Sequence, residues 1–254
     1  MTYQGLDPRT RLVRWGLFAI AVAIVLAVTL PAAADALLRI AQVAPNRLPW
    51  VATRLIGFLS YYAIAGSVIY GLLLSTKILD AIAHRPVTFA LHQDLAAIGL
   101  GLAGVHAVLL GLDASVPFSL VQIFVPFVAP YRPAWVGVGQ VALYLIAIVY
   151  VSFHLRRRIG PRSWRLIHYL TFLAFLGATA HGILSGTDTT AAWAWWSYVG
   201  ASVAVVFLTV YRVVIAIEAR RAGLADPGAA IALSGARGAA ARRPSPLDLR
   251  APGR

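Results

Sequence analysis

Histidines are the side chains in this sequence best suited to chemistry, because four of the six fall inside long apolar stretches. His92 and His106 lie in one such stretch, and His168 and His181 lie in another. Ionisable and metal-binding side chains are costly in an apolar environment, so they are retained there mainly for function. The sequence holds no cysteine, which excludes disulfides and thiolate-held clusters and leaves histidine as the strongest soft-metal ligand.

The spacing of these histidines predicts two binding sites at two depths. On an α-helix the 14-residue step from His92 to His106 is a rise of about 21 Å and leaves the two side chains only about 40° apart. The 13-residue step from His168 to His181 leaves them about 140° apart, so we expect a tightened or bent stretch near Gly177 to align them. Pairing across the two helices gives two bis-histidine sites, a ligand set that suits electron-transferring b-type haem.

A second interpretation of the same histidines is open. A histidine inside a membrane helix can form a hydrogen bond to a neighbouring helix, or it can titrate in a proton pathway. Two matched pairs at two depths favour haem over this alternative. We expect His84 to be an interfacial loop residue and His154 a helix-end cation, and neither to be a ligand.

Composition predicts that a membrane positions these residues. The 254 residues are 60% hydrophobic and 12% charged, with a mean hydropathy of +0.77. A hydrocarbon core about 30 Å thick needs about 20 mostly apolar residues per helix. We therefore expect an all-α fold, a polytopic bundle of six transmembrane helices over residues 12–217, with a retained first helix. The expected helices are 12–31, 52–75, 88–112, 135–156, 163–186 and 193–217.

Basic residues predict the orientation of this bundle. If both termini lie on one side with loops 76–87 and 157–162, that side and its membrane borders hold 18 of the 22 Lys and Arg residues. Because positively charged loops stay in the cytoplasm, we expect a multi-pass protein of the inner (cytoplasmic) membrane with both termini cytoplasmic. Residues 1–11 then form the N-terminus, and residues 218–254 form a disordered basic tail able to touch membrane lipid. This topology accounts for the net charge of +13 without nucleic acid.

Cationic side chains near the membrane borders are candidate partners for haem propionates, which are carboxylates. Arg54 and Arg132 are the candidates on the outer side. Arg165 is the inner candidate, with Arg85 and Arg162 nearby. For each inner arginine taken singly, positive-inside topology is the competing explanation.

Small residues flank the histidines on both helices. Gly99, Gly101 and Gly104 precede His106, and Gly177 and Gly182 surround His181. They offer room for a flat porphyrin, and close helix packing is the alternative. The first three also spell a dinucleotide-binding fingerprint, which we reject because no strand precedes it.

The outer loop from residue 113 to residue 133 is amphiphilic. It combines large apolar and aromatic side chains with several prolines. We expect it to lie on the membrane surface as a partial cap.

Three segments carry a resemblance to a known family. They read Tyr-Arg-Pro-Ala-Trp-Val-Gly over 131–137, Gly-Pro-Arg-Ser-Trp-Arg-Leu-Ile-His over 160–168, and His-Gly-Ile-Leu-Ser-Gly-Thr-Asp-Thr over 181–189. With the histidines, they make residues 50–217 resemble the ferric reductase-like transmembrane family. This six-helix haem core is shared with NADPH oxidases and with the haem-binding subunit of periplasmic methionine sulfoxide reductase, and its histidine steps are similar. The resemblance implies an inner haem b held by His92 and His168 and an outer one held by His106 and His181.

The resemblance also implies a function, that of a b-type cytochrome component of an oxidoreductase. Relatives that draw electrons from NADPH carry a flavin and nicotinamide module after the sixth helix, where this sequence shows a short basic segment. We therefore expect electrons from a separate reductase, from quinol, or from a flavin or quinone supplied by a partner. The acceptor is a ferric chelate, oxygen or a periplasmic redox partner. The alternatives are a dedicated haem subunit of one periplasmic reductase and a non-redox protein whose histidines move protons.

Overall fold

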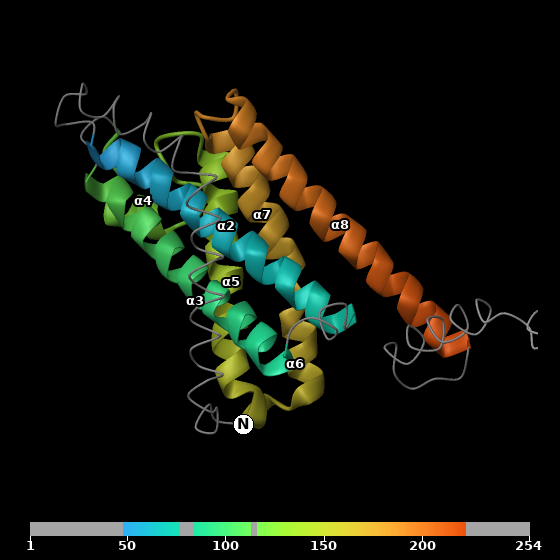
Figure 1. The fold of residues 1–254 in the computed structure, drawn as a ribbon. Helices are drawn as coiled ribbons and strands as arrows, with labels where there is room; N and C mark the ends of the chain where they lie inside the picture. Colours follow the sequence, from blue (N-terminus) through green and yellow to red (C-terminus); the bar gives the residue numbers. More distant parts are fainter. Residues whose placement is uncertain (1–47, 77–83, 113–115, 222–254) are drawn as a thin grey trace, which may run out of the picture.

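The computed structural model describes residues 48–76, 84–112 and 116–221, and it is all-α over these ranges (Figure 1). The prediction of an all-α fold is confirmed for this part of the chain. The expected helix at 12–31, the N-terminal segment 1–11 and most of the tail 218–254 lie outside the described residues. The elements are α2 (Leu48–Thr76), α3 (Arg85–Leu109) with the 3₁₀ turn η3 (Leu110–Leu112), α4 (Leu120–Phe124), α5 (Pro133–Ile159), α6 (Pro161–His168), α7 (Leu170–Ser185) and α8 (Ala192–Arg221).

Five helical stretches among the described residues are long and apolar enough to cross a membrane, as expected of a multi-pass membrane protein. They are Leu48–Thr76, Arg85–Leu112, Pro133–Ile159, Pro161–Ser185 and Ala192–Glu218. Each lies within a few residues of one of the last five predicted ranges. Large apolar side chains remain exposed on their outer surfaces, as at Val206 (62%), Phe207 (65%) and Val210 (57%) on α8. A lipid environment solvates such side chains, whereas water would not.

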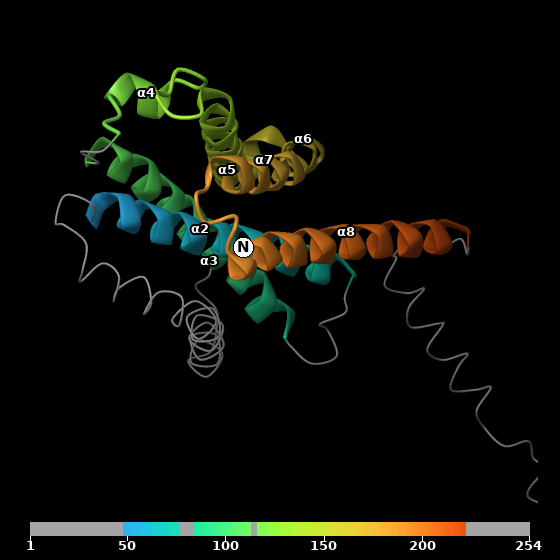
Figure 2. The same cartoon turned by 90° about the horizontal axis from the view of Figure 1, so that it is seen from above.

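The helices form two groups that meet along α2. Viewed from above, α2, α3 and α8 lie on one side of the molecule and α5, α6 and α7 on the other (Figure 2). Within the groups α2 packs against α3 and α8, and α5 packs against α6 and α7; between them α2 contacts α7 and α3 contacts α5. By contrast, α3 and α7 are not a packed pair among the described elements. The helices that carry the intramembrane histidines therefore face each other with little direct packing.

A glycine separates α5 from α6. Gly160 has φ +81° and ψ 159°, a conformation that is essentially restricted to glycine, and its N–H donates to the carbonyl of Arg156 at 3.1 Å. Pro161 follows as the first residue of α6, where the missing N–H of proline costs nothing. This turn sends α6 and α7 back along α5 and so sets the depth of His168 and His181.

The helix that carries these two histidines is interrupted at Tyr169, directly after His168. The N–H of Tyr169 donates to the carbonyl of Leu166, and the N–H of Phe172 donates to that of Tyr169, both at 3.2 Å. Such bonds to the third preceding residue tighten the turn, so that the chain rotates further per residue. This extra rotation brings His168 and His181 closer to one face of the helix. The break in the helix therefore lies at Tyr169 and not near Gly177, where a distortion was expected, since α7 runs unbroken from Leu170 to Ser185.

Candidate cofactor site

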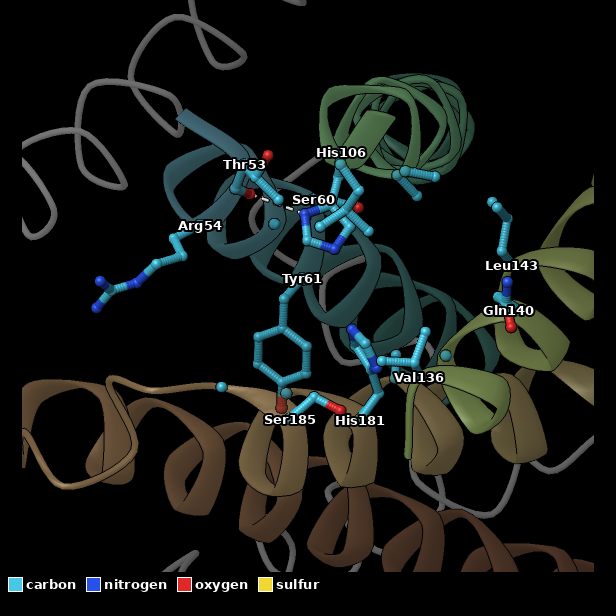
Figure 3. Close-up of a pocket in the computed structure, with 18 of the residues that line it drawn as sticks. Thr53, Arg54, Ser60, Tyr61, His106, Val136, Gln140, Leu143, His181 and Ser185 are labelled. Atoms are coloured by element: carbon cyan, nitrogen blue, oxygen red, sulfur yellow. Dashed lines mark hydrogen bonds between the residues drawn. The ribbon is translucent and has the colours of Figure 1, made fainter. Parts of the chain in front are cut away.

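The four intramembrane histidines form two facing pairs. The ring centres of His92 on α3 and His168 on α6 are 6.1 Å apart, with an angle of 76° between the ring planes. Those of His106 on α3 and His181 on α7 are also 6.1 Å apart, at 81°. Figure 3 shows His106 and His181 reaching toward each other into one cavity from two different helices. The structure thus brings together the residues of both predicted pairs.

The ring separation suits a metal ion shared by two imidazoles. A metal–nitrogen bond to histidine is about 2 Å long. With ring bonds near the usual C–N length of about 1.33 Å, the nitrogen lies about 1.1 Å from the ring centre. Two ligands on opposite sides of one ion then have ring centres about 6 Å apart, which both pairs match. No group of three or more metal-binding side chains occurs within the described ranges, so the histidine pairs suit a group that brings its own equatorial ligands, such as a porphyrin.

Hydrogen bonds fix the tautomer of three of the four histidines. Three of the four Nδ1 atoms lie next to a backbone carbonyl: that of His92 at 2.8 Å from Ser67, that of His106 at 2.7 Å from Thr53, and that of His181 at 2.9 Å from Trp135. Because a carbonyl can only accept, each of these Nδ1 atoms carries the proton and donates it. The Nε2 atom is left unprotonated, as in most metal-binding histidines.

Three glycines on neighbouring helices make room for these rings. A Cβ added to Gly57 would lie 2.8 Å from Nδ1 of His106, one on Gly71 would lie 3.0 Å from Cε1 of His92, and one on Gly139 would lie 2.5 Å from Nδ1 of His181. Sequence reasoning missed all three. A signal was present, since Gly57 and Gly71 on α2 are 14 residues apart, the same step that separates the two histidines on α3.

The glycines singled out in the sequence serve mainly in helix packing. A Cβ on Gly99 would lie 2.7 Å from Ile64, and one on Gly177 would lie 3.2 Å from Ala142. Gly101 has no heavy atom within 4 Å of such a Cβ. The packing alternative therefore holds at Gly99 and Gly177.

Each histidine pair borders its own cavity. The outer cavity, with His106 and His181 in its wall, measures about 400 Å³, and the inner one, with His92 and His168, measures about 240 Å³. Four buried side-chain polar atoms have no hydrogen-bond partner among the described residues, and all belong to residues that line these cavities. They are Thr53 Oγ1, Gln140 Oε1 and Ser185 Oγ in the outer cavity and Trp164 Nε1 in the inner one. Since buried polar groups are nearly always paired, these atoms mark positions where a ligand's polar edge can bind.

The outer loop covers the outer cavity. Its short helix α4 begins with reciprocal hydrogen bonds between Ser119 and Gln122, a capping box. Gln140 of α5 then donates from Nε2 to the carbonyls of Gln122 and Ile123, at 2.8 and 2.7 Å. Gln122, Ile123 and Tyr131 line the cavity, so the loop covers part of it, and its position on the membrane surface stays a prediction.

The two outer arginines differ in their placement. Arg54 lines the outer cavity, forms an ion pair with Asp188 and lies over the ring of Trp50 at 4.1 Å. Its side chain extends away from the two histidines (Figure 3). Arg132, at φ +40°, donates to the carbonyl of Leu184 at 2.5 Å and does not line the cavity.

On the inner side, Arg165 lines the cavity, and its predicted role as a propionate partner stays a prediction. Arg212 of α8, which sequence reasoning missed, lines the same cavity. Arg85 and Arg162 are exposed and line neither cavity. The sequence does contain a signal for Arg212, because it is the one basic residue within Ala192–Glu218.

The remaining histidines, His84 and His154, are exposed and lie outside both cavities, as expected.

Comparison of the chain with protein-family models, with curated proteins and with solved structures finds no match. The resemblance seen in the sequence therefore remains a prediction, and the site is interpreted from its own geometry.

Proposed function

We propose that this protein is a transmembrane b-type cytochrome that carries electrons through two bis-histidine haems. His92 and His168 hold the inner haem, and His106 and His181 hold the outer one. The observation that carries the proposal is the 6.1 Å separation in both pairs, at two depths of the bundle. When bound, each haem supplies reversible one-electron chemistry between ferric and ferrous iron.

The protein side chains hold and insulate the two redox centres. His92 and His168 would hold one haem and His106 and His181 the other, and such bis-histidine ligation would suit electron transfer rather than substrate binding. The hydrogen bonds from Nδ1 of His92, His106 and His181 to backbone carbonyls keep the rings oriented and increase the basicity of Nε2. The wall of the outer cavity is largely apolar, and such a wall would limit the access of water to a bound haem.

The distribution of charge supports a direction for this transfer. Arg156, Arg157 and Arg158 end α5 near the inner pair, and positive-inside topology assigns that end to the cytoplasm. On this proposal the protein lies in the inner membrane with both termini cytoplasmic. A reductase, a flavin or quinol delivers electrons on the inner side. A ferric chelate, oxygen or a periplasmic redox protein accepts them on the outer side.

Haem content and spectra test the proposal. The full chain purified from haem-sufficient cells should show b-type bands in reduced-minus-oxidised spectra and about two haems per chain. H106A and H181A should each remove the same haem, and H92A and H168A the other. H154A is the matched control, because His154 lies outside both cavities, and it should keep both haems. A colourless preparation contradicts the proposal.

A further inference from the structure

Arg212 is the one basic residue in the largely apolar helical stretch Ala192–Glu218. Arginine is costly at such a position and is retained there mainly where it has a charged or polar partner. Its side chain lines the inner cavity together with that of Arg165, which comes from α6. Neither arginine side chain forms an ion pair or hydrogen bond with another described residue.

A third donor faces the same cavity. Nε1 of Trp164 is buried without a hydrogen-bond partner among the described residues, and the indole ring lies 5.3 Å from that of His168. Guanidinium and indole groups only donate hydrogen bonds, so together they require an acceptor. The described lining contains no aspartate or glutamate to supply one.

We infer that Arg165, Arg212 and the indole N–H of Trp164 bind the carboxylate groups of the ligand held between His92 and His168. This inference rests on the proposed function, under which those carboxylates are the propionates of the inner haem. Arginine binds carboxylates through paired, charge-assisted hydrogen bonds, which suits this role better than lysine does. The polar edge of the inner haem then points toward α6 and α8.

An anionic lipid headgroup could offer the same oxygen acceptors to the two arginines. The propionates are the better match, because the indole N–H is buried next to a proposed axial ligand and the histidines share the cavity with both arginines. A cationic group beside the haem favours the added electron, so these residues also raise the reduction potential of the inner haem.

Potentiometric titration of R212Q in the purified full chain tests the assignment. We expect the reduction equilibrium of one haem to become at least tenfold less favourable, about 59 mV for a one-electron couple, while the other haem is unchanged. R220Q is the matched control, because it removes the same charge from an exposed position farther along α8 that does not line the cavity. R212K should recover part of the shift, and R165Q should lower the potential of the same haem.

Equal potentials in R212Q and R220Q would overturn the carboxylate assignment while leaving the proposed function in place. So would loss of a co-purified anionic lipid from R212Q, detected by mass spectrometry, with both haems unchanged. A wild-type protein without haem would overturn both the proposed function and this assignment. If R212Q does not accumulate in cells, the reduction potentials of R165Q and R212K test the assignment instead. Wild-type potentials in both variants would overturn it.

Discussion

At the scale of single residues, the rings of the proposed ligands fit where they do because neighbouring helices carry glycine, which has no side chain. His106 and His181 each lie where a neighbouring helix carries a glycine, Gly57 on α2 and Gly139 on α5. A methyl group at either position would come within van der Waals contact of Nδ1, the atom that anchors the ring to a backbone carbonyl. These glycines therefore make room for the rings of the proposed ligands, in addition to any role in helix packing.

Alanine at these glycines should cost one haem. We expect G57A and G139A each to reduce the outer haem by half or more and to leave the inner haem at its wild-type level, because the added methyl group displaces the ring. Haem per chain and the reduced-minus-oxidised spectrum measure this. G101A is the control, since a Cβ there meets no heavy atom within 4 Å, and it should keep both haems. Unchanged haem content in G57A and G139A would contradict this role.

The sequence predicted which histidines meet, because their depth follows from residue counting along apolar helices. It could not predict the partners of their Nδ1 atoms, and the 14-residue step from Gly57 to Gly71 does not say which histidine each glycine meets, since both depend on how far one helix is displaced along its neighbour. Arg212 was overlooked for a related reason. One charge does not stop a long apolar stretch from being a membrane helix, and only the packing of α8 places it at a cavity.

At the scale of elements, hydropathy and length predicted the five described membrane helices, because backbone groups in hydrocarbon must be satisfied within a helix. The break at Tyr169 was not predictable in this way. The apolar pattern continues across it, and no proline or glycine marks it. The five-residue helix α4 is also too short for a periodic signal, and its position depends on distant hydrogen bonds from Gln140.

The turn between α5 and α6 gives a stability prediction. G160A should lower the free energy of unfolding by about 1–3 kcal/mol, because a Cβ is strained at φ +81° and ψ 159°. Thermal unfolding in detergent measures the change. G104A is a control in a helix with no heavy atom within 4 Å of the added Cβ, and it should be neutral or slightly stabilising. Equal melting temperatures for the two variants would contradict the strain argument.

The cap on the outer cavity gives a second element-scale prediction. Q140L removes the two hydrogen bonds that tie α5 to the carbonyls of Gln122 and Ile123. We expect amide hydrogen exchange over residues 116–131 to become at least tenfold faster, because leaving these buried carbonyls unpaired costs about 1–3 kcal/mol each. Exchange in α8, which is not extensively packed against α4, serves as the internal reference. Unchanged exchange in the cap would show that other contacts hold it.

At the scale of the whole molecule, the absence of cysteine makes the proposed orientation directly measurable. A single cysteine in place of Thr190, which is exposed between α7 and α8, should react with a membrane-impermeant maleimide when the outer membrane is permeabilised and the inner membrane is closed. A single cysteine in place of Arg157, in the last turn of α5, should react only after the inner membrane is opened. The reverse pattern would invert the assigned direction of electron flow.

The two groups of helices meet along α2, yet α3 and α7 have little direct packing where the histidines face across. Under the proposed function, haem takes the place of side-chain packing at that boundary, so its binding free energy becomes part of the folding free energy. The quantity of finished protein in a cell should then follow the supply of haem. Chains made under haem starvation should assemble as looser bundles that membrane proteases clear, and restoring haem should rescue new chains before any change in transcription.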